Sequence, residues 1–235
     1  MAGKLVQNNW QQINEVISEA ARRAGRFKDQ VRVVGVAKKQ TVSRVQAALE
    51  AGLKILGENY AQEFLMRQKY FPLPQIEWHF VGHLQSNKAK MVVGQVELIH
   101  SVDRISLAKK IGQVAQKKNI TQSILVEINV DAEPNKSGVL VEKAPQLLES
   151  IQKISGVRLC GLMAMPSLEK SGNESRACFA RVRQLTEQWK FYLSPGSAGH
   201  HFNELSMGTT SDFSYAIEEG ATLVRLGTSL FGPRE

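Results

Sequence analysis

Short apolar runs rich in β-branched residues alternate with segments of helical periodicity along the whole chain. The apolar runs number eight and occupy residues 31–37, 54–57, 76–81, 97–102, 123–130, 158–165, 201–206 and 222–227. Apolar residues recur at helical spacing between them, in segments 43–52, 60–69, 85–93, 104–118, 141–154, 174–190 and 211–219. This alternation predicts parallel strands joined by helical crossovers. Eight such units favour an α/β fold, a single (β/α)8 TIM barrel that spans residues 1–235 as one domain.

An open dinucleotide-binding sheet is the main alternative architecture. It would require a glycine-rich G-x-G-x-x-G turn directly after the first strand. The sequence at that place, residues 37–42, is AKKQTV. The barrel is therefore the favoured prediction.

An extra amphipathic helix is predicted before the first strand. Residues 7–24 place one apolar stripe along a helix, and Gly25 is a suitable stop. The stripe consists of Trp10, Ile13, Val16, Ile17, Ala20, Ala21 and Ala24. After the last strand only TSLFGPRE remains, which is too short for an eighth crossover helix. We therefore expect the N-terminal helix to occupy the vacant place in the outer ring.

Composition and charge narrow the classes of partner. The chain is 43% hydrophobic and 22% charged, which is ordinary for a soluble globular protein, and no linker divides it. It has no apolar stretch suited to a signal peptide or a membrane span, so we expect a cytoplasmic protein that binds no membrane. The formal net charge of +8 comes from scattered Lys and Arg residues without a basic block, which favours a small anionic ligand over nucleic acid. Cys160 and Cys178 lack metal-ligand spacing and are expected to be buried, reduced thiols.

Two lysines, Lys38 and Lys39, end the first apolar run. Active sites of barrels of this kind lie at the carboxyl ends of the strands, on the loops that enter the helices. Because side chains alternate along a strand, one lysine should face the barrel interior and the other the helical layer. Partial burial would favour a neutral, nucleophilic amine suited to Schiff-base chemistry. Two solvated loop lysines are the structural alternative.

Two further features lie at the end of the barrel sequence. The seventh and eighth strands run into ELSMGTTSDF (204–213) and LVRLGTSLFG (223–232), where small residues and glycines precede helical segments. Backbone N–H groups of such loops bind phosphate, so Ser206, Gly208, Gly227 and Thr228 are candidate donors. Arg225 lies inside the last strand and needs an acceptor, either a ligand or a structural acidic partner.

A nucleophilic lysine, a phosphate site and an arginine match three functional groups of pyridoxal 5'-phosphate (PLP), namely its aldehyde, its phosphate and its pyridine nitrogen. A barrel aldolase with a Schiff-base lysine would use only the first two of these groups.

The sequence also resembles the pyridoxal phosphate homeostasis protein family, whose barrel is similar to the N-terminal domain of alanine racemase, a fold-type III PLP-binding fold. The motifs that carry the resemblance are AARRAGR (20–26), VGVAKKQ (34–40), LGENYAQE (56–63), WHFVGHLQSNK (78–88), LMAMPSL (162–168), LSMGTTSDF (205–213) and VRLGTSLFG (224–232). The resemblance implies that Lys38 carries the cofactor as a Schiff base and that Arg225 faces the pyridine nitrogen. It also implies Asn59 beside the ring, with Ser206, Met207, Gly227 and Thr228 at the phosphate.

The chain departs from the family pattern on either side of the lysine, at Ala37 and Lys39, and after the SMG motif, at Thr209 and Thr210. None of these changes removes a residue that is expected to bind the cofactor. We add His79, near the end of the third strand, to the candidate cofactor-binding residues. His83 is a weaker candidate, because structural histidines are commoner than catalytic ones. Tyr60, next to Asn59, is a similarly weak candidate.

Two functions are compatible with these residues. An arginine at the pyridine nitrogen disfavours the protonated ring, which makes the cofactor a weaker electron sink. Racemisation needs an acid and a base on opposite faces of the Cα atom, and the sequence supplies only Lys38. We therefore favour a non-catalytic carrier or regulator in PLP homeostasis and amino-acid and keto-acid balance over an amino-acid racemase. The family implies a monomer, and transient contacts with PLP-dependent apoenzymes are compatible with a carrier.

Overall fold

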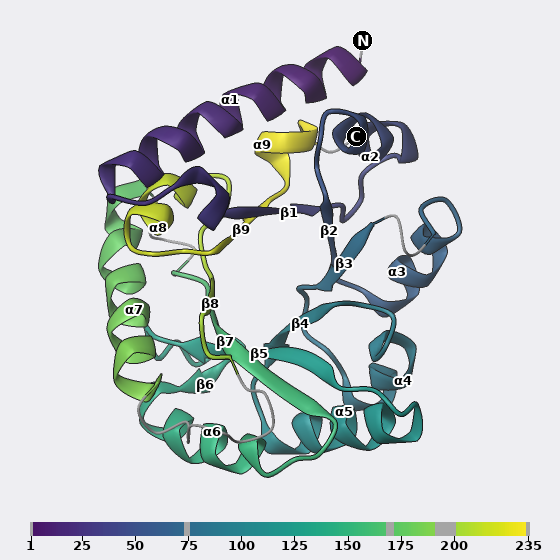
Figure 1. Cartoon of the computed structure of the whole chain (residues 1–235), viewed down its shortest axis with the longest axis vertical. Coiled ribbons are helices and arrows are strands. Elements are labelled where there is room, and N and C mark those ends of the chain that lie inside the picture. The colour runs from purple at the N-terminus through teal and green to yellow at the C-terminus, as the bar shows by residue number, and fades with distance from the viewer. Residues whose placement is uncertain (1, 73–75, 168–171, 191–200, 234–235) are drawn as a thin grey trace.

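The predicted barrel forms the centre of the computed structural model, which describes residues 2–72, 76–167, 172–190 and 201–233 (Figure 1). Its parallel strands are β1 (Arg32–Val36), β2 (Ile55–Glu58), β3 (Glu77–Phe80), β4 (Leu98–Val102), β5 (Gln122–Asn129), β7 (Val157–Ala164), β8 (Glu204–Ser206) and β9 (Leu223–Leu226). Neighbouring strands follow the order β4-β3-β2-β1-β9-β8-β7-β5, and pairing of β4 with β5 closes the barrel. The sequence-based prediction of a closed eight-stranded barrel is confirmed.

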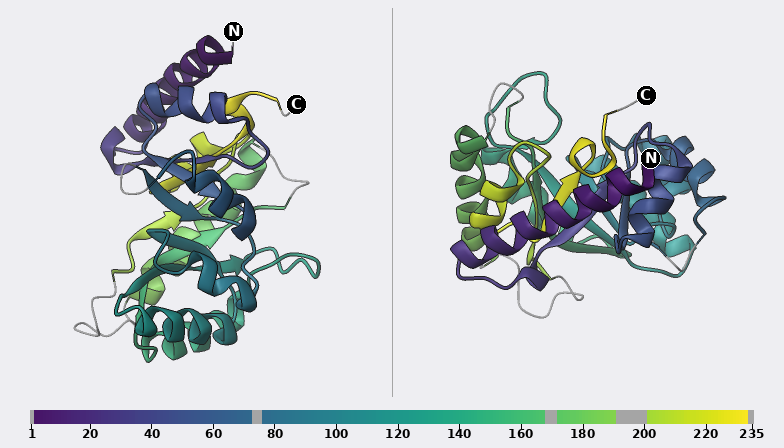
Figure 2. Two further views of the ribbon diagram at one scale, coloured as in Figure 1. Left: turned by 90° about the vertical axis from the view of Figure 1, so that its right-hand side faces the viewer. Right: turned by 90° about the horizontal axis from the view of Figure 1, so that it is seen from above.

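The helices form the outer layer of this barrel, as Figures 1 and 2 show. They are α1 (Ala2–Arg23), α2 (Val42–Glu50), α3 (Ala61–Gln68), α4 (Ala89–Val92), α5 (Ile105–Lys117), α6 (Ala144–Gln152), α7 (Arg176–Lys190), α8 (Phe213–Glu218) and α9 (Thr228–Phe231). Short 3-10 turns are η1 (Lys28–Gln30), η2 (Ser86–Lys88), η3 (Val141–Lys143) and η4 (Gly172–Ser175). A two-residue strand, β6 (Val139–Leu140), pairs with the end of β5 and was not predicted, because two residues carry no periodic signal.

Helix α1 fills the gap in the outer ring, as predicted. It packs against α2, α8 and α9 and extends across one side of the barrel (Figure 2). The Asn9 side chain donates to the backbone carbonyl of Leu230 in α9 at 3.1 Å, and Arg23 pairs with Glu218 of α8 at 2.7 Å. The predicted stripe needs one correction: Val16 is 38% exposed, because it lies at the edge of the buried face.

The apolar interior has two parts. A small cluster fills the inside of the barrel and consists of Val34, Ile55, Val81, Leu98, Leu125, Met163 and Leu223. A larger cluster lies between the strands and the helices, where Phe64 of α3 packs edge-to-face on Trp78 of β3. Alternate residues of each strand therefore face the barrel lumen and the helical layer, as strand geometry requires.

Neither Cys160 nor Cys178 forms a disulfide, and Cys178 is buried while Cys160 is partly buried. In the described part of the chain, no helix combines the length and the apolar character that a bilayer crossing requires.

Candidate functional site

The two lysines lie in a tight turn at the carboxyl end of β1. The backbone N–H of Gln40 donates to the carbonyl of Ala37 at 3.0 Å and closes the turn. Lys38 is partly buried, whereas Lys39 is exposed and adopts a left-handed backbone with φ of +56°. The side chain of Thr41 then caps α2 by accepting from the backbone N–H of Arg44. The two lysines thus differ in environment, as predicted, although a turn and not strand alternation places Lys39 in solvent.

An arginine from α3 holds this lysine turn in place. Arg67 donates to the carbonyl oxygens of Ala37 at 3.0 Å and of Gln40 at 3.3 Å. It also pairs with Oε1 of Glu58 at 2.5 Å, and Glu58 is fully buried at the end of β2. Burial raises the pKa of Glu58, while the Arg67 charge acts in the opposite direction. Sequence reasoning missed this pair; its signal was an acidic residue in the apolar run ILGE (55–58).

Lys38 lies beside the residues that follow β2. Its Nζ atom is 5.0 Å from the centre of the Tyr60 ring, a cation–π distance. The Oδ1 atom of the neighbouring Asn59 is buried and has no hydrogen-bond partner. Asn59, Tyr60 and His83 line a cleft of about 280 Å³ at this edge of the barrel. An unpaired buried amide oxygen next to Tyr60 fits a polar ligand, because such an atom is costly when it is left without a partner.

Arg225 is buried inside the barrel on β9, the strand that pairs with β1, where it lies opposite Val34. Its Nη1 donates to Oγ of Ser206 at 2.6 Å, and its Nη2 donates to the carbonyl of Ala164 at 3.1 Å. Its acceptors here are neutral, and burial lowers its pKa to about 10. The arginine therefore stays charged at neutral pH. Burial also raises the pKa of nearby Glu127 to about 7.

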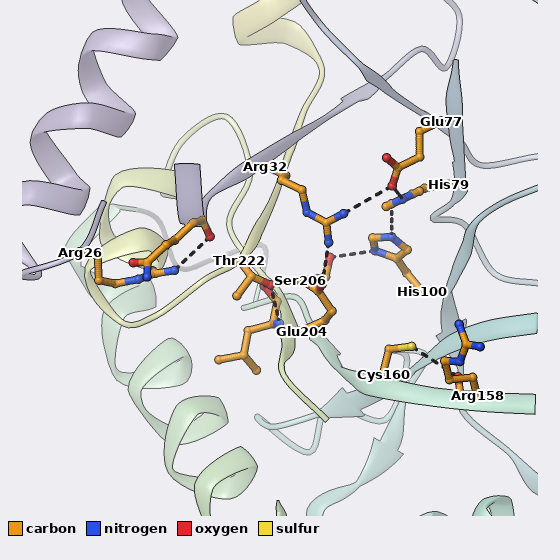
Figure 3. Close-up of polar contacts among 12 residues, drawn as sticks. Arg26, Arg32, Glu77, His79, His100, Arg158, Cys160, Glu204, Ser206 and Thr222 are labelled. Carbon is orange, nitrogen blue, oxygen red and sulfur yellow. Dashed lines mark hydrogen bonds and ion pairs between the residues drawn. The ribbon is translucent and has the colours of Figure 1, made fainter. Parts of the chain in front are cut away.

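A series of buried polar contacts leads away from Ser206 through the barrel interior (Figure 3). Nδ1 of His100 lies 2.8 Å from the Ser206 hydroxyl, and its Nε2 lies 2.9 Å from Nδ1 of His79. Nε2 of His79 lies 2.9 Å from Glu77 Oε1. Protein groups thus engage both ring nitrogens of His79, and its contact with the cofactor stays a prediction. His100 was missed, although it interrupts the apolar run LIHSV (98–102).

The candidate phosphate loops lie side by side after β8 and β9. Ser206 and Met207 are fully buried, and the backbone N–H of Arg225 donates to the carbonyl of Gly208 at 3.0 Å. Thr210 and Ser229 link the two loops, with their hydroxyl oxygens 3.1 Å apart.

The two loop glycines differ in the space around them. A Cβ atom at Gly227 would meet only the carbonyl of Val36, at 3.7 Å, so the backbone there is open to close approach by a ligand. Gly227 precedes α9, and Thr228 at the start of that helix is exposed. Gly208, by contrast, has φ of +89° and a backbone closely packed by its neighbours.

Fold and site together define a (β/α)8 barrel with a lysine at the end of its first strand and a buried arginine on its last. The sequence profile of the family described as "Alanine racemase, N-terminal domain" matches residues 5–235. A relative from Aquifex aeolicus (strain VF5), named pyridoxal phosphate homeostasis protein, is 39% identical over 221 residues, which cover 94% of this chain and 95% of the relative. The chain therefore belongs to the alanine racemase N-terminal domain family and, within it, to the pyridoxal phosphate homeostasis protein family.

Two solved structures resemble the whole barrel. An unknown protein from Bifidobacterium adolescentis has a TM-score of 0.88 and 31% identity, with 97% of this chain and 95% of that chain covered. PipY of Synechococcus elongatus PCC7942, solved with PLP bound, has a TM-score of 0.79 and 31% identity, with 92% and 100% covered. The resemblance inferred from the sequence motifs and the fold-type III barrel are confirmed.

Proposed function

We propose that this chain binds PLP at the carboxyl end of the barrel and acts as a non-catalytic carrier in intracellular PLP homeostasis and amino-acid and keto-acid balance. The observation that carries this proposal is the placement of Lys38 and Arg225. Lys38 lies in the turn that follows β1, and Arg225 is buried on β9, the strand that pairs with β1. The structure of PipY with PLP bound, at 31% identity, supports the choice of ligand.

The residues present fit the three functional groups of PLP, its aldehyde, its phosphate and its pyridine nitrogen. Lys38 is the amine that would form the Schiff base, and Asn59, whose Oδ1 atom has no hydrogen-bond partner, would lie beside the ring. Met207, Gly227 and Thr228 would bind the phosphate, and open space at Gly227 permits close approach. Ser206 would contribute there through its backbone, because its hydroxyl already contacts Arg225 and His100. When bound, PLP supplies an aldehyde that reacts reversibly with amines and a ring that withdraws electrons.

The charge of Arg225 supports a carrier over a racemase. With a pKa of about 10 it is protonated at neutral pH, and a second positive charge on an adjacent pyridine nitrogen would be disfavoured. The ring then withdraws electrons less strongly. One observation favours the racemase alternative: Glu127, with a pKa of about 7, is a titratable carboxyl near Arg225. It is 9% exposed, so it would need access to substrate to serve as a second base.

Reduction of the purified, PLP-treated protein with borohydride, followed by peptide mapping, tests the site. We expect a yellow protein whose colour is lost on reduction, with the phosphopyridoxyl group on Lys38. The variant K38A should lose covalent attachment, while K39A should retain it because Lys39 is exposed in solvent. Attachment at Lys39, or a colourless protein after incubation with PLP, would refute the assignment.

The carrier and racemase alternatives differ in turnover. Chiral chromatography of several amino acids incubated with the PLP-treated protein should give no more racemisation than free PLP does. Saturable turnover that is lost in E127Q would establish the racemase. A monomeric state, a cytoplasmic location and transient contacts with PLP-dependent apoenzymes belong to the same proposal and stay predictions.

A further inference from the structure

A continuous line of hydrogen bonds crosses the barrel interior from one mouth to the other. It starts at Arg225, below the proposed ring site, and passes through Ser206, His100 and His79 to Glu77. The successive donor–acceptor distances are 2.6, 2.8, 2.9 and 2.9 Å. The five residues come from four strands, β9, β8, β4 and β3, so the line joins segments far apart in sequence.

The chemistry of the two ends fixes the direction of every bond in this line. A guanidinium can only donate, so Ser206 accepts from Arg225 and has its single hydroxyl proton left for His100. The hydrogen bond from His79 lowers the pKa of Glu77, so the other end is a carboxylate, which can only accept. His79 must then donate from Nε2 to Glu77, and His100 must donate from Nε2 to Nδ1 of His79.

The charge states of the two histidines agree with this direction. Burial lowers the pKa of His79 and moves that of His100 well below its ordinary value. Both rings are therefore neutral at pH 7 and carry one proton each. A neutral imidazole has one donor and one acceptor nitrogen, which is the arrangement that each position in the line requires.

The far end of the line is open to solvent. The Glu77 side chain is 34% exposed, and Nη1 of Arg32 approaches it at 3.4 Å. Arg32 makes a shorter contact of 2.6 Å with Glu204 (Figure 3). Glu77 and Arg32 line two cavities at the amino-terminal mouth, of about 670 and 710 Å³. The carboxylate can thus be replaced without substitution of any residue at the carboxyl-terminal mouth.

We propose that Glu77 is a positioning residue that acts on the cofactor site from across the barrel, by orienting Arg225 through His79, His100 and Ser206. The inference rests on the proposed function for its effect on PLP, but the hydrogen-bond direction is a property of the chain alone. Without an acceptor at position 77, His79 has no partner for its Nε2 proton. The neighbouring bonds then rearrange, and the Ser206 hydroxyl is free to leave Arg225.

Nitrogen NMR of the histidine rings in PLP-free protein tests the direction. We expect both His79 and His100 to carry their proton on Nε2 in the wild type. In the variant Glu77→Leu the His79 signal should change towards the Nδ1 tautomer. A wild-type protein with the proton on Nδ1 of either ring would overturn the proposal, whether or not the chain binds PLP.

The second arm measures PLP affinity and the absorbance maximum of the bound cofactor. Glu77→Leu should weaken PLP binding about fivefold, the factor for one modest hydrogen bond, and shift the absorbance maximum. Glu77→Gln keeps an acceptor and should restore both values. Glu97→Leu is the matched control, because Glu97 lines the same mouth and lies outside the line. Equal effects of the changes at positions 77 and 97 would refute the inference.

The variant His100→Asn gives an independent check inside the barrel. Its amide oxygen replaces Nδ1 and keeps the contact with Ser206, but the side chain is too short to reach His79. If the line matters as a whole, this variant should match Glu77→Leu in affinity and absorbance. If His100→Asn has the PLP affinity and absorbance maximum of the wild type, only the contact with Ser206 matters, and the role of Glu77 is overturned. A wild-type protein that takes up no PLP would instead refute the proposed function.

Discussion

Replacement of Arg67 by methionine should destabilise the protein strongly, because it leaves a buried carboxylate without its partner. Glu58 is fully buried, and the Arg67 side chain is only 11% exposed, so water cannot replace the lost contact. Removal of one member of such a pair costs about 3 to 5 kcal/mol. The carbonyl oxygens of Ala37 and Gln40 lose a donor in the same variant. The substitution should therefore destabilise the turn that carries Lys38.

The stability lost in R67M should increase as pH rises. Burial already raises the pKa of Glu58, and loss of the Arg67 charge removes an effect that lowers it. The folded variant then binds a proton that the unfolded chain has released, so its stability falls as pH rises above the unfolded value of about 4.5. The difference between wild type and variant should grow by up to about 1.4 kcal/mol per pH unit between pH 5 and 7.

Urea unfolding at pH 5 and pH 7, followed by tryptophan fluorescence, measures both effects. The variants are R67M, E58Q and the double variant E58Q/R67M. Because the double variant has no buried charge at positions 58 and 67, it should regain part of the stability that R67M loses at pH 7. A loss below about 1 kcal/mol in R67M, or a double variant less stable than R67M, would refute the argument.

Three further predictions concern the loops, the interior and the outer ring. Gly208→Ala should destabilise the fold by about 1 to 3 kcal/mol in urea unfolding, because φ is +89° and a Cβ atom would lie 2.6 Å from Cβ of Ala216. E127Q should become more stable than wild type as pH rises from 4.5 to 7, by roughly 3 kcal/mol, since the raised pKa of Glu127 makes its ionisation costly in the folded state only. Deletion of residues 1–25 should cause aggregation, seen by light scattering, and a soluble, folded truncation would contradict the packing of α1 on α2, α8 and α9.

The sequence was sufficient to predict the barrel because its strands and helices carry opposite periodicities. The eight predicted runs overlap the eight barrel strands, and the stripe of α1 identified the helix that completes the ring. Lys38, Lys39 and Arg225 could also be identified from the sequence as candidate site residues. Charged residues at the end of an apolar run or inside it are costly to bury, so their presence indicates a function or a partner. The contacts of His79 and His100 could not be predicted from the sequence, because they join strands that only the closed barrel brings together. Arg67 was hidden for a similar reason: on α3 it has the pattern of an ordinary surface arginine.

Two separate supports hold the two ends of the proposed cofactor site. Lys38 is fixed from outside the barrel, where Arg67 and Glu58 bind its turn, and Arg225 is fixed from inside, through Ser206 and the histidines. The two supports share no hydrogen bond among the contacts of the described residues. Mutations that are more than about 10 Å apart and share no partner usually have additive effects. Changes to the Arg67 pair should therefore alter the rate of covalent attachment at Lys38, whereas changes at Glu77 should alter the absorbance of the bound ring, and a double variant should show the sum of the two.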